Sequence, residues 1–235
     1  MNLKKKRRNK YFNIAIDGPA GAGKSSISFL VAKKLKILHL DTGALYRALA
    51  YHLVSLPNFY EANFNLEENL KKCNVKVKFC EGVQKIFVNE VRVDEFIRTA
   101  RIANFASLIS KDICVREFLL NLQREFAANN NLIMDGRDIG TVVLPNADLK
   151  IFLTASLKVR ALRRFKELTL KGINVSFNDV LSDVKVRDLN DFKRKISPLK
   201  AAKDAVVLNT TNLTIEESVN SILKLVEEFV LEEQI

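Results

Sequence analysis

The chain has 235 residues, and 48% of them are hydrophobic, which is enough for the core of one large domain or of one domain with an inserted subdomain. Trp is absent and only 8 residues are Gly, which excludes low-complexity and fibrous chains. No apolar run reaches the length of a membrane span and none resembles a secretory leader, so we expect a soluble cytoplasmic protein. Three cysteines in no zinc-binding pattern and two isolated histidines indicate neither a metal cluster nor a catalytic triad.

The positive charge is concentrated at the start of the chain. The formal net charge is +11, and six basic residues precede the first predicted strand: Lys4, Lys5, Lys6, Arg7, Arg8 and Lys10. Such a run is typical of a disordered tail, here residues 1–12, and weak RNA binding is the alternative. The remaining excess suits a protein that binds polyanions.

A glycine-rich loop follows the first apolar run, Ile14-Ala15-Ile16, which predicts a buried strand. The loop reads Gly18-Pro19-Ala20-Gly21-Ala22-Gly23-Lys24-Ser25 and matches G-x-x-x-x-G-K-[ST]. Apolar residues then recur at helical spacing, and a loop between strand and helix binds phosphate through its backbone N–H groups. Lys24 can reach the β- and γ-phosphates of a nucleoside triphosphate, and the Ser25 hydroxyl can hold Mg²⁺. The flanking strand and helix argue against a chance match in a glycine-rich turn.

Five short apolar runs separated by helical stretches predict a parallel sheet with helices on both faces, a three-layer α/β/α fold of the P-loop NTPase type. The predicted strands span residues 14–17, 37–40, 132–135, 150–153 and 206–208. The polar motifs follow the strands directly, and ligands bind such sheets at the carboxyl ends of the strands.

One segment departs from this pattern. Residues 75–80 alternate apolar and polar side chains, and the short runs 86–88 and 91–93 follow, which predicts a small antiparallel sheet inserted at about residues 64–96. A helix-rich segment spans residues 99–128. Further along, Ser156 is placed to cap a helix, residues 169–176 form a loop, and helices are expected at 178–194 and at 215–230. The last helix begins with a capping box of Thr214 and Glu217.

Two strand ends carry candidate anion and metal ligands. Thr42 follows the second strand, where it is placed to cap a helix, and Arg47 lies more than a turn further on. Together they could form a second anion site, but taken alone they read better as an ordinary cap with a solvated arginine. Asp135-Gly136-Arg137-Asp138 ends the third sheet strand. A carboxylate such as Asp135 beside a phosphate loop commonly orients Mg²⁺ or its waters.

Two helices add clusters of arginine. Arg187, Asp191 and Arg194 share one helix face, and Arg160, Arg163 and Arg164 cluster on another helix. Each cluster alone reads best as a solvated, salt-bridged face. One triphosphate site with arginines from several segments, however, fits phosphoryl transfer between two nucleotides, because catalysis of that reaction depends on positioning and on electrostatic stabilisation.

The order of these motifs resembles that of the bacterial cytidylate kinases, which are nucleoside monophosphate kinases. The resemblance covers most of the chain after about residue 13. It rests on the glycine-rich loop with Ile16 and Asp17, on Asp41-Thr42-Gly43-Ala44-Leu45-Tyr46-Arg47, on Ile97-Arg98-Thr99, on Asp135-Gly136-Arg137-Asp138-Ile139-Gly140-Thr141-Val142-Val143, and on Arg187-Asp188. The loop is generic to many kinases, whereas the segment from Asp135 and the inserted antiparallel sheet are specific.

The resemblance implies a substrate, a cofactor or a role for each motif. ATP is implied at Gly18, Pro19, Ala20, Gly21, Ala22, Gly23, Lys24, Ser25 and Ser26, and Mg²⁺ at Ser25 with Asp135 acting through water. CMP or dCMP is implied at Thr42, Arg47, Ser107, Arg116, Arg137, Asp138, Arg187, Asp191 and Arg194. The catalytic cations would be Lys24, Arg137, Arg187, Arg194 and Arg164. A monomer with no membrane partner and no obligate nucleic acid is expected.

The resemblance also implies which part of the substrate each of these residues binds. Thr42, Arg47, Arg137 and Arg194 would grip the acceptor phosphate, Ser107, Arg116 and Asp138 would read cytosine, and Arg187 with Asp191 would read the sugar. Arg160, Arg163 and Arg164 would belong to a mobile lid at about residues 156–176, which closes over the phosphates and excludes water.

The base assignment agrees with the chemistry of cytosine. Asp138 can accept from the exocyclic amino group, and Arg116 and Ser107 can donate to N3 and O2. Uracil reverses the polarity at two positions and would leave buried polar groups unpaired, a mismatch worth on the order of 10⁴-fold in the best sites. We therefore expect CMP and dCMP to be phosphorylated well above UMP.

The chain departs from the family pattern between Arg187 and Asp191. The family often carries another arginine there, whereas this chain has Asp188-Leu189-Asn190. Lys193 or Lys195 could replace its charge but not a bidentate guanidinium. The competing hypotheses are another small-molecule P-loop kinase, of the UMP, AMP or shikimate type, and an RNA-binding protein with a nucleotide site. A GTPase switch is disfavoured because no Asn-Lys-x-Asp segment is present.

Overall fold

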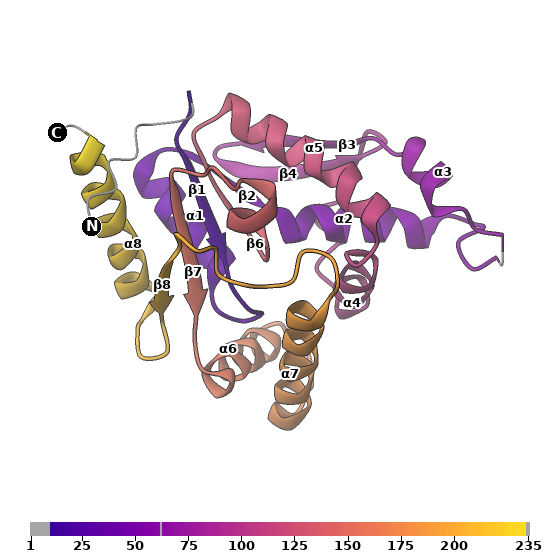
Figure 1. Cartoon of the computed structure of the whole chain (residues 1–235). Helices are drawn as coiled ribbons and strands as arrows, with labels where there is room; N and C mark the ends of the chain where they lie inside the picture. Colours follow the sequence, from indigo (N-terminus) through magenta and orange to yellow (C-terminus); the bar gives the residue numbers. More distant parts are fainter. Residues whose placement is uncertain (1–9, 62, 234–235) are drawn as a thin grey trace.

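The computed structural model describes residues 10–61 and 63–233, and a five-stranded parallel sheet lies at its centre (Figure 1). The strands are β1 (Asn13–Asp17), β2 (Leu38–Asp41), β6 (Leu132–Gly136), β7 (Leu149–Thr154) and β8 (Val206–Asn209). They lie in the order β2-β6-β1-β7-β8, and each falls within one residue of the run that predicts it. Apart from Lys10, the basic residues of the predicted tail lie outside the described residues.

The sheet carries helices on both faces, because its strands alternate between two cores. Ile14 and Ile16 face α1 (Lys24–Leu35) and α8 (Ile215–Glu233), whereas Ala15 and Met134 face the core that includes α2 (Thr42–Ser55) and α5 (Ile113–Asn129). Successive residues of a strand point to opposite faces, so one buried strand supplies both layers. The predicted three-layer α/β/α fold is confirmed.

A second, smaller sheet is antiparallel, as the alternation predicts. It consists of β3 (Val75–Cys80), β4 (Val83–Val88) and β5 (Val91–Arg92), preceded by α3 (Leu66–Lys71). Ile86 and Val88 point from β4 into the core shared with α2. Asn89 and Glu90 both have positive φ angles, 47° and 66°, which suits the tight two-residue turn between β4 and β5.

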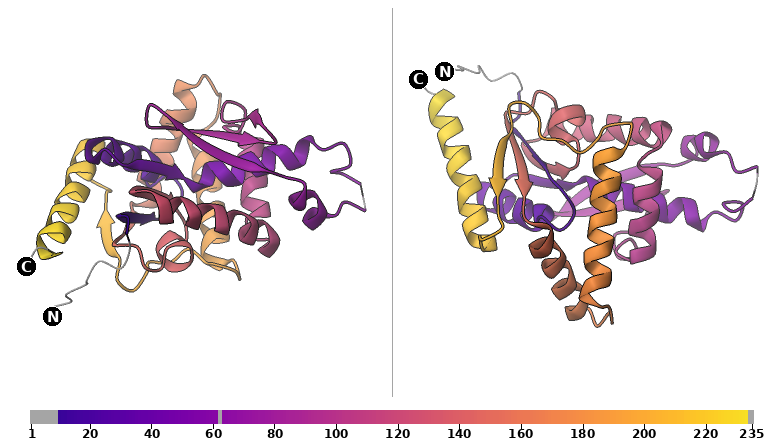
Figure 2. Two further views of the ribbon diagram at one scale, coloured as in Figure 1. Left: turned by 90° about the horizontal axis from the view of Figure 1, so that it is seen from above. Right: turned by 60° about the horizontal axis from the view of Figure 1, so that its bottom comes forward.

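Three more helices surround the carboxyl ends of β1, β2 and β6. These are α4 (Ala100–Ile109), α6 (Leu157–Leu170) and α7 (Phe177–Lys193), and a short π-helix, η1 (Ile139–Val143), follows β6. Figure 2 shows that α6 and α7 form a hairpin that projects from the sheet. The hairpin has its own small core of Ala161, Val180 and Val184.

The predicted capping residues are mostly confirmed. Ser156 accepts a hydrogen bond from the Val159 N–H (3.4 Å) at the start of α6, and Thr214 and Glu217 form the capping box of α8. The predicted loop at residue 169 begins later, because α6 continues to Leu170 before Gly172 (φ 72°) ends the turn. None of the helices within residues 10–61 and 63–233 is long and apolar enough to cross a membrane.

Candidate functional site

The glycine-rich loop joins β1 to α1 in a conformation that only glycine allows. Gly18 has φ 152°, and a Cβ there would lie 2.0 Å from the Leu153 carbonyl oxygen of β7. Gly23 caps α1 with φ 89°. A helix N-terminus with left-handed residues before it directs its N–H groups toward the loop, which is the geometry of a phosphate site.

Lys24 is the buried cation of this loop. Its Nζ donates to the Pro19 carbonyl oxygen at 2.9 Å, so the side chain folds back over the loop that it follows. Burial, with repulsion from Arg137, lowers the pKa of Lys24 to about 7. An anion beside Lys24 would restore its charge, because an opposite charge at short range stabilises the protonated amine.

Ser25 and Asp135 meet beside the loop, as the Mg²⁺ hypothesis requires. The Ser25 hydroxyl donates to Oδ2 of Asp135 at 2.8 Å, and Nε2 of His39 lies 2.6 Å from Oδ1 of the same carboxylate. Asp135 is buried, and the hydrogen bond from His39 holds its pKa below the usual value against the effect of burial. The sequence indicates no partner for His39. Its contact depends on β2 lying beside β6, which no local pattern in the sequence reports.

The first turn of α2 differs from the prediction. Asp41, not Thr42, caps the helix: its Oδ1 accepts from the Ala44 N–H at 3.0 Å. Thr42 is already helical, and its hydroxyl donates to the Asp135 carbonyl oxygen at 2.8 Å. The prediction was wrong because either residue can cap a helix, and only the approach of β6 gives the hydroxyl of Thr42 another partner.

Arg47 lies beside this turn, half-buried. Its Nη2 donates to Oδ2 of Asp41 at 2.9 Å. Gln84 of β4 accepts from the Asp41 N–H at 2.8 Å and thereby ties the small sheet to the strand end. Gln84 is a contact that sequence reasoning missed, because the inserted sheet carries no motif of its own.

The turn after β6 is fixed by Gly136 and Asp17. A Cβ on Gly136 would lie 2.6 Å from Cδ1 of Ile139 and 2.7 Å from Oγ1 of Thr42. Asp17, at the end of β1, accepts from the Ile139 and Gly140 N–H groups at 2.7 and 2.8 Å. Burial raises the pKa of Asp17 to about 6 although both hydrogen bonds oppose the shift. These contacts fix the backbone that carries Arg137 and Asp138.

Two of the three predicted base-reading residues lie together. Nη2 of Arg116 pairs with Oδ2 of Asp138, and both side chains are buried. Arg194, expected at the acceptor phosphate, also donates to Asp138, at Oδ1 (3.3 Å). Ser107 lies half-buried in α4, and Ser110 bridges it to Arg116: Ser110 donates to the Ser107 carbonyl oxygen at 2.9 Å and accepts from Arg116 at 3.3 Å.

Arginines from separate segments gather next to this cluster. Arg137 donates from Nε to Oδ2 of Asp191 at 2.7 Å. Arg187 is lowered in pKa by burial and then by the nearby charges of Arg137, Arg164 and Arg47. The fold therefore holds like charges from the turn after β6 and from α2, α6 and α7 close enough to repel one another. Lys193 and Lys195, the suggested substitutes for the missing arginine, are both exposed.

The three arginines of α6 lie in different environments. Arg160 is buried and bridges two elements: it donates to the Ala20 carbonyl oxygen of the loop at 2.9 Å and pairs with Asp188 of α7 at 2.7 Å. Arg163 donates to the carbonyl oxygen of Thr210 at 2.7 Å. Arg164 alone resembles a solvated pair, with Glu167 at 2.8 Å. Helical spacing groups the three residues, but only the packing of α6 separates them.

Comparisons with known proteins relate almost the whole chain to one family. The family model for cytidylate kinase matches residues 14–228. The chain is similar to the cytidylate kinases of Thermosipho melanesiensis (47% identity; 92% of this chain, 96% of the relative) and Ligilactobacillus salivarius (48% identity; 93% and 98%). Among solved structures, an uncharacterised protein of Eubacterium ventriosum has the same fold, with a TM-score of 0.52 at 12% identity over 92% of this chain and 98% of that chain.

Proposed function

The chain belongs to the cytidylate kinase family, and from that premise we propose that its site transfers the γ-phosphoryl group of ATP to CMP or dCMP. The products are ADP and CDP or dCDP. An oxygen of the acceptor phosphate attacks the γ-phosphorus in line and the β–γ bridging oxygen leaves, so no side chain forms a covalent intermediate. The enzyme is a phosphotransferase.

The observation that carries this proposal is the gathering of cations around Lys24. Arg137 lies close enough to lower the pKa of Lys24, and Arg187 lies within the repulsive field of Arg137, Arg164 and Arg47. Charges that repel one another are held together by a fold only at a cost, which two bound polyanions would offset. We call residues 18–26 with Asp135 the donor side.

The acceptor side comprises the residues proposed for CMP, which are Thr42, Arg47, Ser107, Arg116, Arg137, Asp138, Arg187, Asp191 and Arg194. Arg47, Arg137, Arg194 and Thr42 would bind its phosphate, and Arg187 with Asp191 its sugar. Asp138 would accept from the cytosine amino group, since an ionised carboxylate can accept hydrogen bonds but cannot donate them. CMP would then compete with Arg116 and Arg194 for the oxygens of Asp138.

Mg²⁺ fits the donor side. Ser25 and Asp135 offer oxygen ligands 2.8 Å apart, directly after the phosphate loop. In the described part of the chain no cluster of three His, Cys, Asp or Glu side chains could hold a metal. That agrees with an ion that keeps most of its ligands as waters and phosphate oxygens. When bound, Mg²⁺ would neutralise charge on the β- and γ-phosphate oxygens. Ser25 and Asp135 would hold it, Asp135 through water.

Two segments are proposed to close around the substrates. Residues 64–96, which include the small sheet, would close on the monophosphate side, and residues 156–176, which include α6, would act as a lid. Closure would exclude water and keep ATP from being hydrolysed. Consumption of ATP without CMP should therefore be much slower than with it, and equal rates would reject this gating. We also propose that the enzyme acts as a cytoplasmic monomer, since one chain contributes both sides.

A substrate panel tests the proposal directly. ADP release is measured with CMP, dCMP, UMP, AMP and shikimate as acceptors, with ATP and Mg²⁺ present. We expect CMP and dCMP to be far better acceptors than the others. UMP turnover as fast as that of CMP would reject the roles of Ser107, Arg116 and Asp138. Turnover of AMP or shikimate alone would favour the other kinase types.

The RNA-binding alternative is separated by two variants. Deletion of residues 1–10 should leave kinase activity nearly intact, whereas Lys24→Ala should lower it by about 10²- to 10³-fold. Loss of activity on deletion, with Lys24→Ala unaffected, would favour RNA binding through the basic run.

A further inference from the structure

His39 is a buried polar residue that the proposed reaction does not use. It lies in the middle of β2, and only 8% of it is exposed. Its Nε2 is 2.6 Å from Oδ1 of Asp135. A carboxylate can only accept a hydrogen bond, so the ring nitrogen is the donor. Both oxygens of Asp135 therefore have one donor each: His39 on Oδ1 and Ser25 on Oδ2.

The sheet places this contact across neighbouring strands. β2 and β6 are parallel, with Asp41 opposite Asp135 and His39 opposite Ile133. The imidazole of His39 thus reaches a carboxylate that is two residues further along the adjacent strand. Phe29 of α1 packs edge-on against the ring, with centroids 6.4 Å apart. The ring orientation is therefore restricted from one side by packing and from the other by Asp135.

We infer that His39 is a positioning residue, which fixes the rotation of the Asp135 carboxylate so that Oδ2 stays at the Ser25 hydroxyl and at the Mg²⁺·ATP site. The inference rests on the proposed function and adds a residue to its donor side. The last torsion of an aspartate is broad, so a carboxylate held at one oxygen only can rotate away from a metal or its waters. Partners that orient a metal-binding carboxylate commonly change metal affinity or activity 10- to 100-fold when removed.

The competing explanation is that His39 only satisfies a buried carboxylate and so stabilises the fold. The two explanations differ in what His39 affects. A positioning role predicts weaker metal binding in the folded protein, whereas a purely structural role predicts lower stability with unchanged metal binding. Activity alone does not separate them, so metal binding must be measured directly.

The experiment measures the Kd of Mn²⁺ for the full chain in the presence of a saturating non-hydrolysable ATP analogue. The electron paramagnetic resonance signal reports the concentration of free Mn²⁺. His39→Leu removes the donor at similar size, and His39→Gln carries an amide nitrogen that can reach the position of Nε2. We expect the Kd of Mn²⁺ to rise about 10-fold in His39→Leu and to stay within about 3-fold of the original in His39→Gln. The Mg²⁺ concentration for half-maximal activity should shift in parallel, with the KM for CMP unchanged.

Two results would overturn the inference. One is an unchanged Mn²⁺ affinity in a folded His39→Leu; the other is a His39→Gln that binds as weakly as His39→Leu. If His39→Leu does not fold, His39→Asn serves instead, because its amide is too short to reach Asp135. Equal affinities for the Asn and Gln variants would then reject the inference. Failure of the proposed function is a separate result, since it would appear as an unaltered chain that binds Mn²⁺·ATP analogue and does not phosphorylate CMP.

Discussion

The donor and acceptor sides of the site are built in different ways. The proposed donor side is one continuous loop with Asp135 beside it, and the groups proposed to bind phosphate are mostly backbone N–H groups, with one buried cation in Lys24. The acceptor side takes its side chains from α2, α4, α5, the turn after β6 and α7, and several of them pair with one another. The backbone groups of the loop therefore lie within one segment, and only Asp135 is brought to them by another strand. A site made of paired side chains depends on how the segments pack.

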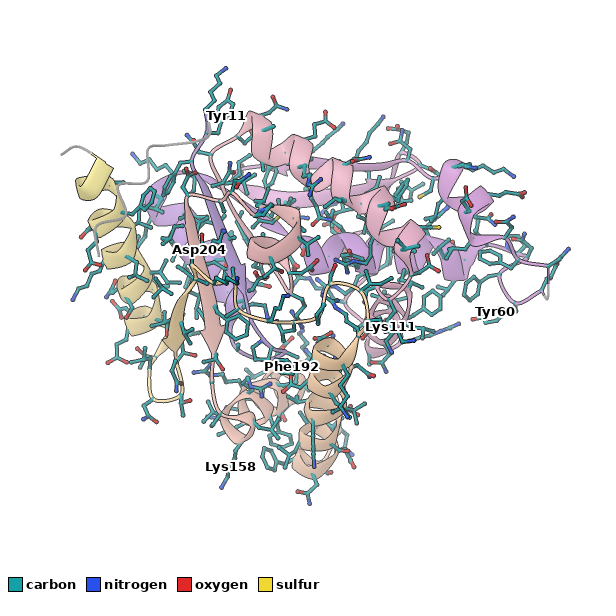
Figure 3. The ribbon with its side chains drawn as sticks, viewed as in Figure 1. Tyr11, Tyr60, Lys111, Lys158, Phe192 and Asp204 are labelled. Atoms are coloured by element: carbon teal, nitrogen blue, oxygen red, sulfur yellow. The ribbon has the colours of Figure 1, made fainter. Side chains whose placement is uncertain are left out.

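The contacts that hold α7 beside the site also differ in burial. Figure 3 shows Lys111 and Phe192 near the C-terminal end of α7, where the corner between α4 and α5 approaches that helix. There the exposed Lys111 donates to the half-buried Asn190 at 3.5 Å. Such surface contacts contribute little, in contrast to the buried bridge from Arg160 to the loop. The contact at this corner should therefore hold α7 less firmly than Arg160 does.

Removing the one donor-side cation should have the largest effect. In Lys24→Ala we expect kcat/KM to fall by about 10²- to 10³-fold, because no other side chain of the loop can stabilise charge on the transferring phosphoryl group. ADP release with CMP is the measurement, and Lys33→Ala, an exposed position on the same helix, is the control. A Lys24→Ala enzyme within 10-fold of the control would mean that the acceptor side supplies the essential charge.

The bridge between the two sides is tested by Arg160→Met. Asp188 would remain buried without its partner, so we expect the free energy of unfolding to fall by about 3 to 5 kcal/mol in urea. The double variant Arg160→Met, Asp188→Asn should recover most of the loss. Arg164→Met, in the more exposed pair, should change stability by less than about 1 kcal/mol. An equal loss of unfolding free energy in Arg160→Met and Arg164→Met would contradict the stabilising role of the buried pair between Arg160 and Asp188.

Asp17, which joins β1 to η1, should make the free energy of unfolding depend on pH. Its folded-state pKa of about 6 lies above the ordinary 3.8, so the native state binds this proton more tightly than the unfolded state does. The stabilisation is present below about pH 4 and is lost as the pH rises through 6, by up to about 3 kcal/mol. Urea unfolding at pH 4 to 7 should show this loss for the unaltered chain relative to Asp17→Asn. A difference that is constant with pH would contradict it.

The smallest expected effect concerns base recognition. In Asp138→Asn the ratio of kcat/KM for CMP over UMP should fall on the order of 10²-fold, because an amide can donate to uracil where a carboxylate can only accept. The substrate panel gives the ratio, and the KM for ATP should not change. An unchanged ratio would move base recognition away from Asp138, although Asp138 would still hold Arg116 and Arg194.

Much of the fold followed from local sequence patterns. The strands β1, β2, β6, β7 and β8 were predicted within one residue, because each is a short apolar run between helical segments. The antiparallel sheet was predicted because β3 alternates in period two. Ser156 was the correct cap. Thr42 was not, because the sequence offers Asp41 and Thr42 as adjacent capping residues and does not say which of them has another partner.

The order β2-β6-β1-β7-β8 is what the sequence leaves open, and the site depends on it. Placing β6 between β1 and β2 brings Asp135 to Ser25 and to His39, and it brings the hydroxyl of Thr42 to the Asp135 carbonyl oxygen. The same placement sets the end of β1, with Asp17, against the amides of Ile139 and Gly140. None of these pairs is nearby in sequence.

By itself, then, the sequence determined the phosphate loop, the strands and the residue types around it, because a glycine-rich turn, an apolar run and a helix cap are decided by interactions between near neighbours. Only the tertiary structure decided which charges meet. Arg160 is buried, although its spacing places it on a solvated face. Arg116 and Arg194 both pair with Asp138, and His39 pairs with Asp135. Electrostatic contacts act through space between segments far apart in the chain, so they follow from the packing of the sheet and not from periodicity along it.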